Sequence, residues 1–476
     1  MAALTVAGGV GAGERAWGQG EWLPSFKPPV VFLSGGSYPF GVAAGDVTGG
    51  LGGGPDGYPD LAVACGHYDV NHAWTQSATP EPKALVRIFR NTKNWANPAD
   101  GLSPYQDIFF PEFNNFSGGL YYAKTVPAEV RFAHMNPQED DFLDLVVSAS
   151  ALDPTDPVFD PVHSTWGVYV FLWEPQPVNQ FVLKSHYVTD LPVRGLAVAD
   201  FDNDGLNDVA VATDLNLLSP FPMDVAYMLR NDPQDPGTLV LGASVPLDLP
   251  SADVSTDVVV GDFNRVAFGL PLIDATTANW VDNNVSVLTN GGSFNFAPAK
   301  RAAPCSSWHF NDLAAGRFTA GSGRDDVAGI VSGNGWVQIL HSDGRGKFTF
   351  DCSQDMLDTY ELLPGGEPIA NAFQGITVGH INLGTKPDVI VTRPANGTGQ
   401  ISFLLGKGDG RFQYVPGNPA YHKSLDPGTG PRSGMAIQVI CVDLNQDGLD
   451  DIVTTNHASD SVSVLINSTV LPPGGG

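Results

Sequence analysis

The sequence contains a nine-residue acidic segment that can fold around a metal ion. Residues 200–208 read DFDNDGLND, so carboxyl side chains stand at positions one, three, five and nine, with glycine at position six. Oxygen ligands at this spacing converge on a hard cation such as calcium, and the glycine permits the sharp bend between them. The segment is not an EF-hand, because position twelve is Val211 rather than glutamate and the flanks alternate like strands.

A second copy with the same spacing lies near the C-terminus, where residues 443–451 read DLNQDGLDD. In both copies the residue at position seven offers its backbone carbonyl as a further ligand. The predicted ligands of bound Ca²⁺ in these two loops are Asp200, Asp202, Asp204, Leu206 and Asp208, and Asp443, Asn445, Asp447, Leu449 and Asp451.

Five diverged copies of the segment complete a repeat that runs along the chain. Successive first positions are 88, 66, 62, 55, 63 and 63 residues apart, and a period of this length with several strands per unit is typical of closed radial arrays. The sequence therefore predicts an all-β fold, a seven-bladed β-propeller of four-stranded blades. The first positions are Asp46, His134, Asp200, Asp262, Arg317, His380 and Asp443.

Two of the diverged copies keep an acid at the first position. The copy that begins at Asp46 is lengthened by residues 51–55, which leaves metal binding there open. The copy that begins at Asp262 lacks the Asp-Gly pair, so a metal is disfavoured. The candidate ligands of the earlier loop are Asp46, Asp56, the carbonyl of Tyr58, and Asp60.

The other three copies replace the first acid with a basic side chain. His134 and His380 are expected to be turn residues rather than ligands. Arg317 is expected to place its guanidinium where the cation would sit, paired with Asp325 or Asp326.

The last repeat supplies three strands, and an unassigned strand at residues 29–34 precedes the first repeat. Giving this strand to the last blade closes the ring without an open sheet edge. The expected division is a leader or signal remnant at 1–28, the propeller at 29–470, and a Pro/Gly tail at 471–476.

Hairpins with glycine-rich turns at 285–294, 337–348 and 401–412 add a second recurring pattern. Together with the acidic loops they make the chain similar to FG-GAP/VCBS repeat proteins, the seven-bladed type also found in the head of integrin alpha chains. The resemblance implies that each loop joins the innermost strand of a blade to the second strand, on one face of the disc. It also implies a calcium-binding module for protein–protein adhesion or assembly.

Charge and motifs narrow the function classes. The formal charge of −27 disfavours nucleic acid and anionic membrane surfaces, and no apolar run is long enough to span a membrane. We find no catalytic motif, so no enzyme is expected. A lectin-type carbohydrate-binding propeller is the alternative, and a sugar-active lyase or dehydratase comes third. Weak calcium loops need about 10⁻⁴ to 10⁻³ M calcium, which points to an extracellular or cell-surface protein.

The long first interval carries many aromatic residues, among them Trp95, Phe109 and Phe110. Either they pack on the outer strand of their own blade, or they form a contact surface for a protein or sugar. The four cysteines lack CxxC spacing, so zinc or redox sites are disfavoured. Cys65 and Cys441 are expected to be buried free thiols. The sequence leaves open whether the other two, Cys305 and Cys352, are paired.

Overall fold

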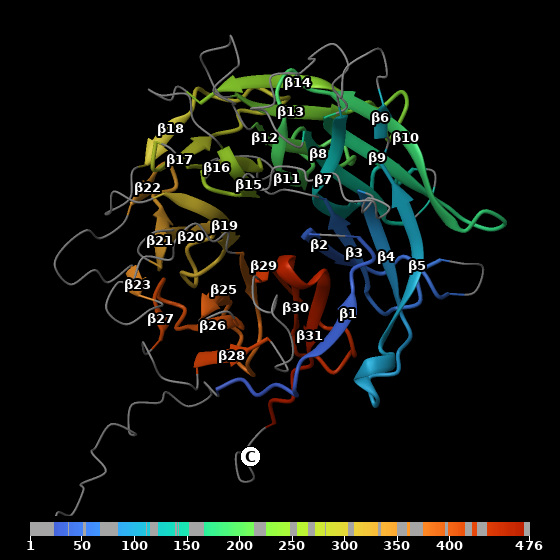
Figure 1. Cartoon of the computed structure of the whole chain (residues 1–476). Helices are drawn as coiled ribbons and strands as arrows, with labels where there is room; N and C mark the ends of the chain where they lie inside the picture. The colour runs from blue at the N-terminus through green and yellow to red at the C-terminus, as the bar shows by residue number, and fades with distance from the viewer. Residues whose placement is uncertain are drawn as a thin grey trace, which may run out of the picture.

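A computed structural model of the chain shows seven antiparallel sheets arranged as a ring (Figure 1). This confirms the predicted all-β, seven-bladed propeller. The structure describes residues 23–36, 38–50, 54–66, 84–110, 112–114, 122–138, 140, 142–151, 166–213, 225–247, 255–264, 272–280, 282–302, 309–331, 335–349, 359–361, 375–395, 398–414, 421–425 and 436–470. The proposed leader, the Pro/Gly tail, Cys305 and Cys352 lie wholly or largely outside these residues.

Blades 1 to 3 each run from an innermost to an outermost strand in chain order. Blade 2 has an additional short strand, β6, paired with its innermost strand. The strands are β2 (Pro39–Gly45), β3 (Asp60–Cys65), β4 (Leu85–Asn91) and β5 (Leu102–Phe109); β6 (Glu112–Asn114), β7 (Tyr122–Ala133), β8 (Asp144–Ala151), β9 (Gly167–Glu174) and β10 (Gln180–Val188); and β11 (Val193–Ala199), β12 (Asp208–Thr213), β13 (Val225–Asn231) and β14 (Leu239–Pro246).

Blades 4 to 6 follow the same plan, and in blades 5 and 6 the fourth position is shared by two short strands that pair with the third. The strands are β15 (Ser255–Gly261), β16 (Asp274–Asn279), β17 (Asn284–Leu288) and β18 (Lys300–Ala302); β19 (Phe310–Gly316), β20 (Asp326–Val331), β21 (Trp336–Ser342), β22 (Phe348–Thr349) and β23 (Thr359–Glu361); and β24 (Ile376–Gly379), β25 (Asp388–Ala395), β26 (Thr398–Gly406), β27 (Phe412–Gln413) and β28 (His422–Ser424).

Blade 7 joins the two ends of the chain. It contains β29 (Ala436–Val442), β30 (Asp451–Asn456) and β31 (Ser461–Leu465), and its outermost strand is β1 (Val30–Leu33) from the N-terminal region. β1 pairs antiparallel with β31, which confirms the predicted closure. The contact begins a few residues before β1, because Phe26 forms a bridge with Asn467 and stacks on Phe403 at 5.4 Å.

The core lies between neighbouring blades. The second strand of each blade is packed on both faces, so all six residues of β3 and of β12 are buried. Aromatic rings cross the interfaces, as where Phe201 of blade 3 meets Phe294 of blade 4 edge to face. Burial of this apolar surface is the main force that holds the ring together. No helix among the described residues is long and apolar enough to cross a membrane.

The aromatic residues of the long first interval divide between the two predicted accounts. Trp95 is buried and donates from Nε1 to Asn91 Oδ1 at 3.1 Å, and Phe110 packs in the core beside Tyr169. Phe109 is 57% exposed. Trp95 and Phe110 therefore belong to the packing of the blades, and Phe109 is left on the surface. Cys65 is a buried free thiol, as predicted, and Cys441 is free and partly buried.

A buried aspartate begins the second strand of every blade. In blade 3, Asp208 Oδ2 accepts from Phe201 N at 2.9 Å and Oδ1 accepts from Asn231 N at 2.9 Å. The side chain thus ties the loop after the innermost strand to the end of the third strand. Hydrogen bonds to a buried carboxylate compensate part of its lost hydration. The seven residues are Asp60, Asp144, Asp208, Asp274, Asp326, Asp388 and Asp451.

A side chain at the end of the third strand links most blades to the preceding blade. Asn231 of blade 3 donates from Nδ2 to the carbonyl of Met135 in the loop of blade 2, at 2.7 Å. Blade 2 has Trp173 at this position, and its Nε1 has no hydrogen-bond partner in the described part of the chain. The equivalent bonds run from Asn91 to Leu444, Asn290 to Phe201, Ser342 to Phe263, and Asn467 to Ile381.

Candidate metal centre

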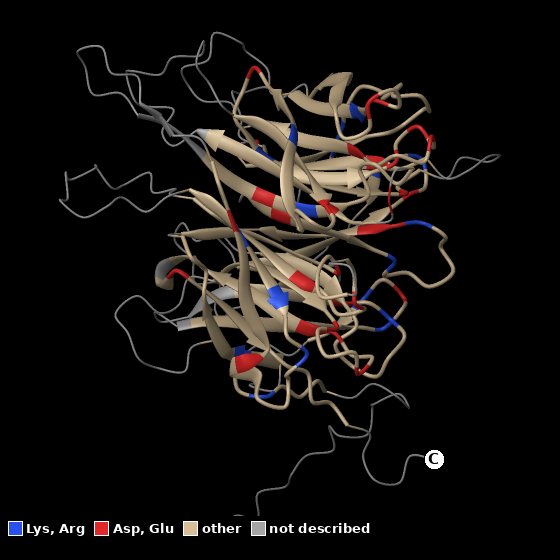
Figure 2. Ribbon diagram, turned by 90° about the vertical axis from the view of Figure 1, so that its right-hand side faces the viewer, with Lys and Arg blue, Asp and Glu red and all other residues tan. Residues whose placement is uncertain are grey.

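The acidic loop of blade 3 joins the innermost strand β11 to the second strand β12. Figure 2 views the disc from its edge and shows charged residues concentrated in the loops on its right-hand side. Asp200 organises the turn. Its Oδ1 accepts from Asp204 N at 3.2 Å and its Oδ2 from Gly205 N at 2.9 Å. Gly205 has φ +89°, a conformation that favours glycine. The glycine predicted to provide the sharp bend does so.

The other two acidic loops have the same local geometry. In blade 7, Asp443 accepts from Asp447 N at 3.1 Å and from Gly448 N at 2.8 Å. In blade 1, Asp46 accepts from the backbone N–H groups of Asp56 and Gly57, so the insertion leaves this turn intact. The two glycines have φ of +88° and +91° respectively.

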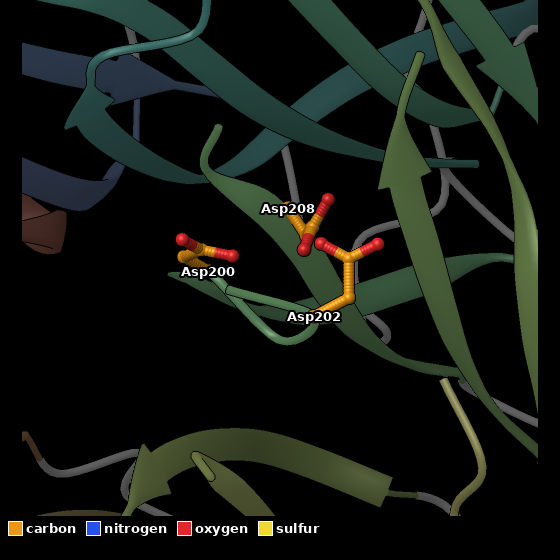
Figure 3. Close-up of side chains that lie close together, drawn as sticks. All are labelled: Asp200, Asp202 and Asp208. Carbon is orange, nitrogen blue, oxygen red and sulfur yellow. The ribbon is translucent and has the colours of Figure 1, made fainter. Parts of the chain in front are cut away.

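Three carboxylates converge in blade 3. Ligand oxygens of Asp200, Asp202 and Asp208 all lie within 4.8 Å of one another, and their side chains border the same space (Figure 3). Within the described ranges, this is the only group of three or more acidic, histidine or cysteine side chains that close together. Asp202 Oδ1 is buried and has no hydrogen-bond partner among the residues that the structure describes. Such an oxygen is costly to bury unless a cation or donor meets it.

Electrostatics at this group favour a bound cation. Burial raises the pKa of Asp208 to about 8, with Asp202 and Asp204 adding to the rise. Burial also raises the pKa of Asp202, again with repulsion from Asp204. Burial is the largest cause of both shifts, and it raises the pKa of Asp144 and Asp274 to about 7 in loops without the metal motif. The added repulsion between neighbouring carboxylates is the part that a divalent cation would relieve.

Asp204, a predicted ligand, already has partners within the protein. Its Oδ1 accepts from Leu206 N at 2.9 Å, and its Oδ2 lies 3.0 Å from Arg230 Nη2. The same Nη2 lies 2.8 Å from Asp202 Oδ2. Arg230 stands at the end of the third strand, one residue before Asn231. Sequence reasoning missed both residues. A recurring asparagine after the third strand was the available signal for Asn231, and nothing distinguished Arg230 from a solvated side chain.

The blade 7 loop has an amide at its third position. Asn445 donates from Nδ2 to Asp447 Oδ2 at 3.0 Å, and Leu449 N donates to Asp447 Oδ1 at 3.0 Å. Burial raises the pKa of Asp451 to about 7, with repulsion from Asp447 and Asp443 adding to it. In the described part of the chain no lysine or arginine pairs with the acids of this loop.

The blade 1 loop already contains a cation of the protein. Lys93 Nζ lies 2.9 Å from Asp56 Oδ2 and 4.8 Å from the centre of the Tyr58 ring. Tyr58 N donates to Asp56 Oδ1 at 3.0 Å, as the position-seven residue does in the other two loops. Asp60 accepts from the backbone N–H groups of Val47 in the loop and Asn91 at the end of the third strand, and five of its six counterparts do the same. The exception is Asp326, which accepts from Ser342 N and from the Thr319 hydroxyl.

The loops without a first acid contain other contacts. Arg317 Nε pairs with Asp325 Oδ1 at 3.2 Å, one of the two partners predicted for it. His134 Nδ1 lies 3.1 Å from the carbonyl of Phe142, and His380 N donates to Asp450 Oδ2 of blade 7 at 2.6 Å. Both histidines sit in turns, as expected.

A second polar cluster occupies the centre of the ring. Glu129 pairs with Arg131 at 2.7 Å and accepts from Gln438 Nε2 at 2.7 Å. Burial raises the pKa of Asp312 well above its usual value, and the adjacent Asp257, hydrogen-bonded to it, adds to the rise. The cavity bordered by these inner strands has a volume of about 30 Å³, which is room for one or two water molecules.

No protein-family model matches the sequence, and no curated protein matches it. Solved structures do resemble the fold. A crystal structure of BBS1N in complex with ARL6DN, soaked with lead, superposes with a TM-score of 0.48 at 11% identity, covering 94% of this chain and 98% of that chain. A structure of the Dos1 propeller superposes with a TM-score of 0.45 at 12% identity, covering 94% of this chain and 88% of that chain. At these identities the likeness concerns the fold alone. The seven four- or five-stranded sheets described above make the chain a seven-bladed β-propeller.

Proposed function

We propose that the protein is a calcium-binding, extracellular propeller that acts as a protein–protein adhesion or assembly module. The observation that carries the calcium assignment is the convergence of Asp200, Asp202 and Asp208 around a buried carboxylate oxygen without a partner. We also propose that the chain is related to FG-GAP/VCBS repeat proteins, on the basis of the residue spacing within and between the acidic loops.

The donor set favours calcium over other metals. All the candidate ligands are oxygens, which excludes neither calcium nor magnesium but disfavours zinc and copper, which prefer nitrogen and sulfur. Calcium accepts six to eight oxygens in irregular geometry, whereas magnesium requires a near-ideal octahedron. A flexible loop with Asp200, Asp202, Asp208 and the Leu206 carbonyl fits the calcium requirement better. Calcium there would neutralise the clustered carboxylates.

The extracellular assignment follows from the expected affinity. Each of the three loops supplies few acidic ligands, and in two of them a lysine or arginine offsets part of the charge. Such sites need calcium at about 10⁻⁴ to 10⁻³ M, a level typical of extracellular modules.

Exposed apolar side chains on the outer strands support a protein partner. They lie on or next to the outermost strands β10 of blade 2 and β14 of blade 3, and Lys184 of β10 pairs with Asp235, in the loop before β14, at 2.6 Å. Apolar residues grouped on a surface mark protein contacts more often than isolated ones do. Among the described residues, Phe109 is the only aromatic side chain with high exposure. Sugar-binding sites usually contain exposed aromatic side chains that stack on the sugar, so this surface favours a protein partner over a sugar. The exposed residues of this rim are Val178, Val182, Leu183, Val188, Val240 and Leu241.

Equilibrium dialysis against millimolar calcium tests the calcium assignment, with one or more calcium ions bound per chain expected at sites of this affinity. A ligand at a hundredfold excess over Kd stabilises the folded state by about 2.7 kcal/mol per site, so chelator should lower Tm and calcium should restore it better than magnesium. Protein without bound calcium, and with the same Tm in calcium and chelator, would refute the assignment.

The partner class is tested by binding from an extracellular-protein array alongside a glycan array. Binding of a protein that is lost in Val182→Ser/Leu241→Ser, with Tm unchanged, is expected. Selective saccharide binding that survives these substitutions would favour the lectin alternative.

A further inference from the structure

The acidic loops differ in the positive charge that the protein itself supplies. In blade 3, Arg230 Nη2 lies 2.8 Å from Asp202 Oδ2 and 3.0 Å from Asp204 Oδ2. It therefore holds one oxygen of each of two loop carboxylates, while Asp202 Oδ1 has no partner in the described part of the chain. In blade 1, Lys93 pairs with Asp56 at 2.9 Å. Both loops carry a built-in counter-charge.

The blade 7 loop has none in the described part of the chain. Asp443 and Asp447 instead accept hydrogen bonds from the loop backbone and from Asn445 Nδ2. These bonds stabilise the turn but add no positive charge, and the described residues supply none from elsewhere, so a cation from solution would relieve the repulsion between the carboxylates.

The same loop also lies at the closure of the ring. Leu444 accepts from Asn91 Nδ2 of blade 1 at 2.8 Å, and Gln446 Nε2 donates to the carbonyl of Gly57 in the blade 1 loop. On its other side, Asp450 accepts from His380 N of blade 6 at 2.6 Å. A change in the shape of this loop would reach both neighbouring blades.

We propose that Arg230 is an internal counter-ion that makes the blade 3 loop largely independent of calcium, and that calcium controls the contact between blades 7 and 1 through the loop at 443–451. The inference rests on the proposed calcium binding. Arg230 lowers the calcium dependence of the blade 3 loop in two ways. Arg230 stabilises the blade 3 loop when calcium is absent, and its charge repels calcium when calcium is present, so the calcium-dependent gain in blade 3 is small.

The first experiment compares hydrogen exchange in calcium and in chelator. Peptides covering 443–451 and the facing residues 57 and 91 should lose protection in chelator by at least tenfold in exchange rate. Peptides covering 200–208 should change by less than threefold. Equal loss in the two loops, or no loss at 443–451, would overturn the inference.

The second experiment uses Arg230→Met, which keeps the length of the side chain and removes its charge. In this variant the 200–208 peptide should become as sensitive to chelator as the 443–451 peptide, and the Tm gain on adding calcium should increase. Arg230→Lys should restore the wild-type behaviour in part. An unchanged calcium response in Arg230→Met would overturn the role given to Arg230.

The matched control is Arg345→Met, which removes an exposed arginine that makes no ion pair among the described residues. Its calcium response should equal that of the wild type. Asp447→Asn should abolish most of the Tm gain on calcium addition, whereas Asp204→Asn should remove little.

The same measurements distinguish failure of this inference from failure of the proposed calcium binding. Calcium bound at one or more per chain, with equal sensitivity of the two loops, contradicts this inference and leaves the proposed function standing. No bound calcium contradicts both.

Discussion

Asn91 donates a 2.8 Å hydrogen bond from Nδ2 to the carbonyl of Leu444, joining the first blade to the last across 353 residues of sequence. The bond belongs to a series that repeats around the ring, and Asn231 makes its counterpart to Met135. Each amide is buried, so the acceptor carbonyl would have no access to water if the donor were removed.

We predict that Asn231→Ala lowers the free energy of unfolding by about 2–3 kcal/mol, because a buried carbonyl left unsatisfied costs about 1–3 kcal/mol and a second carbonyl, of Asn207, also loses its donor. Urea unfolding measures the change. Asn97→Ala, at an exposed position, should shift stability by less than about 0.5 kcal/mol. Equal effects of the two substitutions would contradict the structural role of the buried amide.

Deletion of residues 29–34 removes β1 and exposes the edge of β31. We expect aggregation or a loss of Tm of many degrees, because an unpaired strand edge is a template for pairing with other chains. Size-exclusion chromatography and thermal melts provide the measurement. Deletion of residues 1–18 is the control and should have little effect, and similar behaviour of the two truncations would argue against closure by β1.

Substitution of the aromatic residues of the first interval should affect stability at Trp95 and partner binding at Phe109. Trp95→Ser removes a buried ring and the hydrogen bond to Asn91, and should cost about 3–5 kcal/mol of stability. Phe109→Ser should leave Tm within about one or two degrees and reduce binding of a partner that contacts the outer strand of blade 1. A large Tm loss in Phe109→Ser would place that ring in the core instead.

The polar cluster at the centre of the ring, around Glu129 and Asp312, should make the folding stability depend on pH. Burial and the neighbouring Asp257 and Glu129 raise the pKa of Asp312 in the folded protein above 3.8. Folding therefore takes up a proton between these two pKa values, so the stability from this group is greatest below pH 3.8 and is lost as pH rises through the raised pKa. Arg131 faces the same cluster and reduces the shift without abolishing it.

Asp312→Asn tests this dependence, because an amide can still accept from Ile376 N and can donate to Asp257. Urea unfolding at pH 5 and pH 8 should show a smaller stability difference in the variant than in the wild type. A variant that is less stable than the wild type at pH 8 would show that the carboxylate form stabilises the fold.

The sequence was sufficient for the ring, its closure and the turns of the acidic loops. Oxygen spacing and glycine are local properties, so Asp200 and Gly205 could be assigned a geometry from nine residues alone. The missing fourth strand of blade 7 could be found by counting, which located β1.

The roles set by distant contacts could not be predicted. Asp208 looked like a metal ligand only, yet its oxygens also accept from Phe201 and Asn231, as the same position does in blades without a metal motif. Arg230 gave no signal, because a lone arginine on a strand resembles any solvated side chain. The burial of Trp95 depends on its packing with residues from strands of blades 1 and 7, and the periodicity of the sequence does not predict such contacts.

The seam between blades 1 and 2 has a mechanical consequence. Trp173 stands where five of the other blades place an asparagine or serine and blade 6 has Gly406, and among the described residues its Nε1 donates no hydrogen bond to the loop of blade 1. The outer strands hold this seam instead, through Tyr105 to Asn179 at 2.7 Å and Gln106 to Phe181 at 2.9 Å. Under a force that pulls the disc apart, we expect blades 1 and 2 to separate first on the loop side of this seam, while the hydrogen bonds between their outer strands still hold.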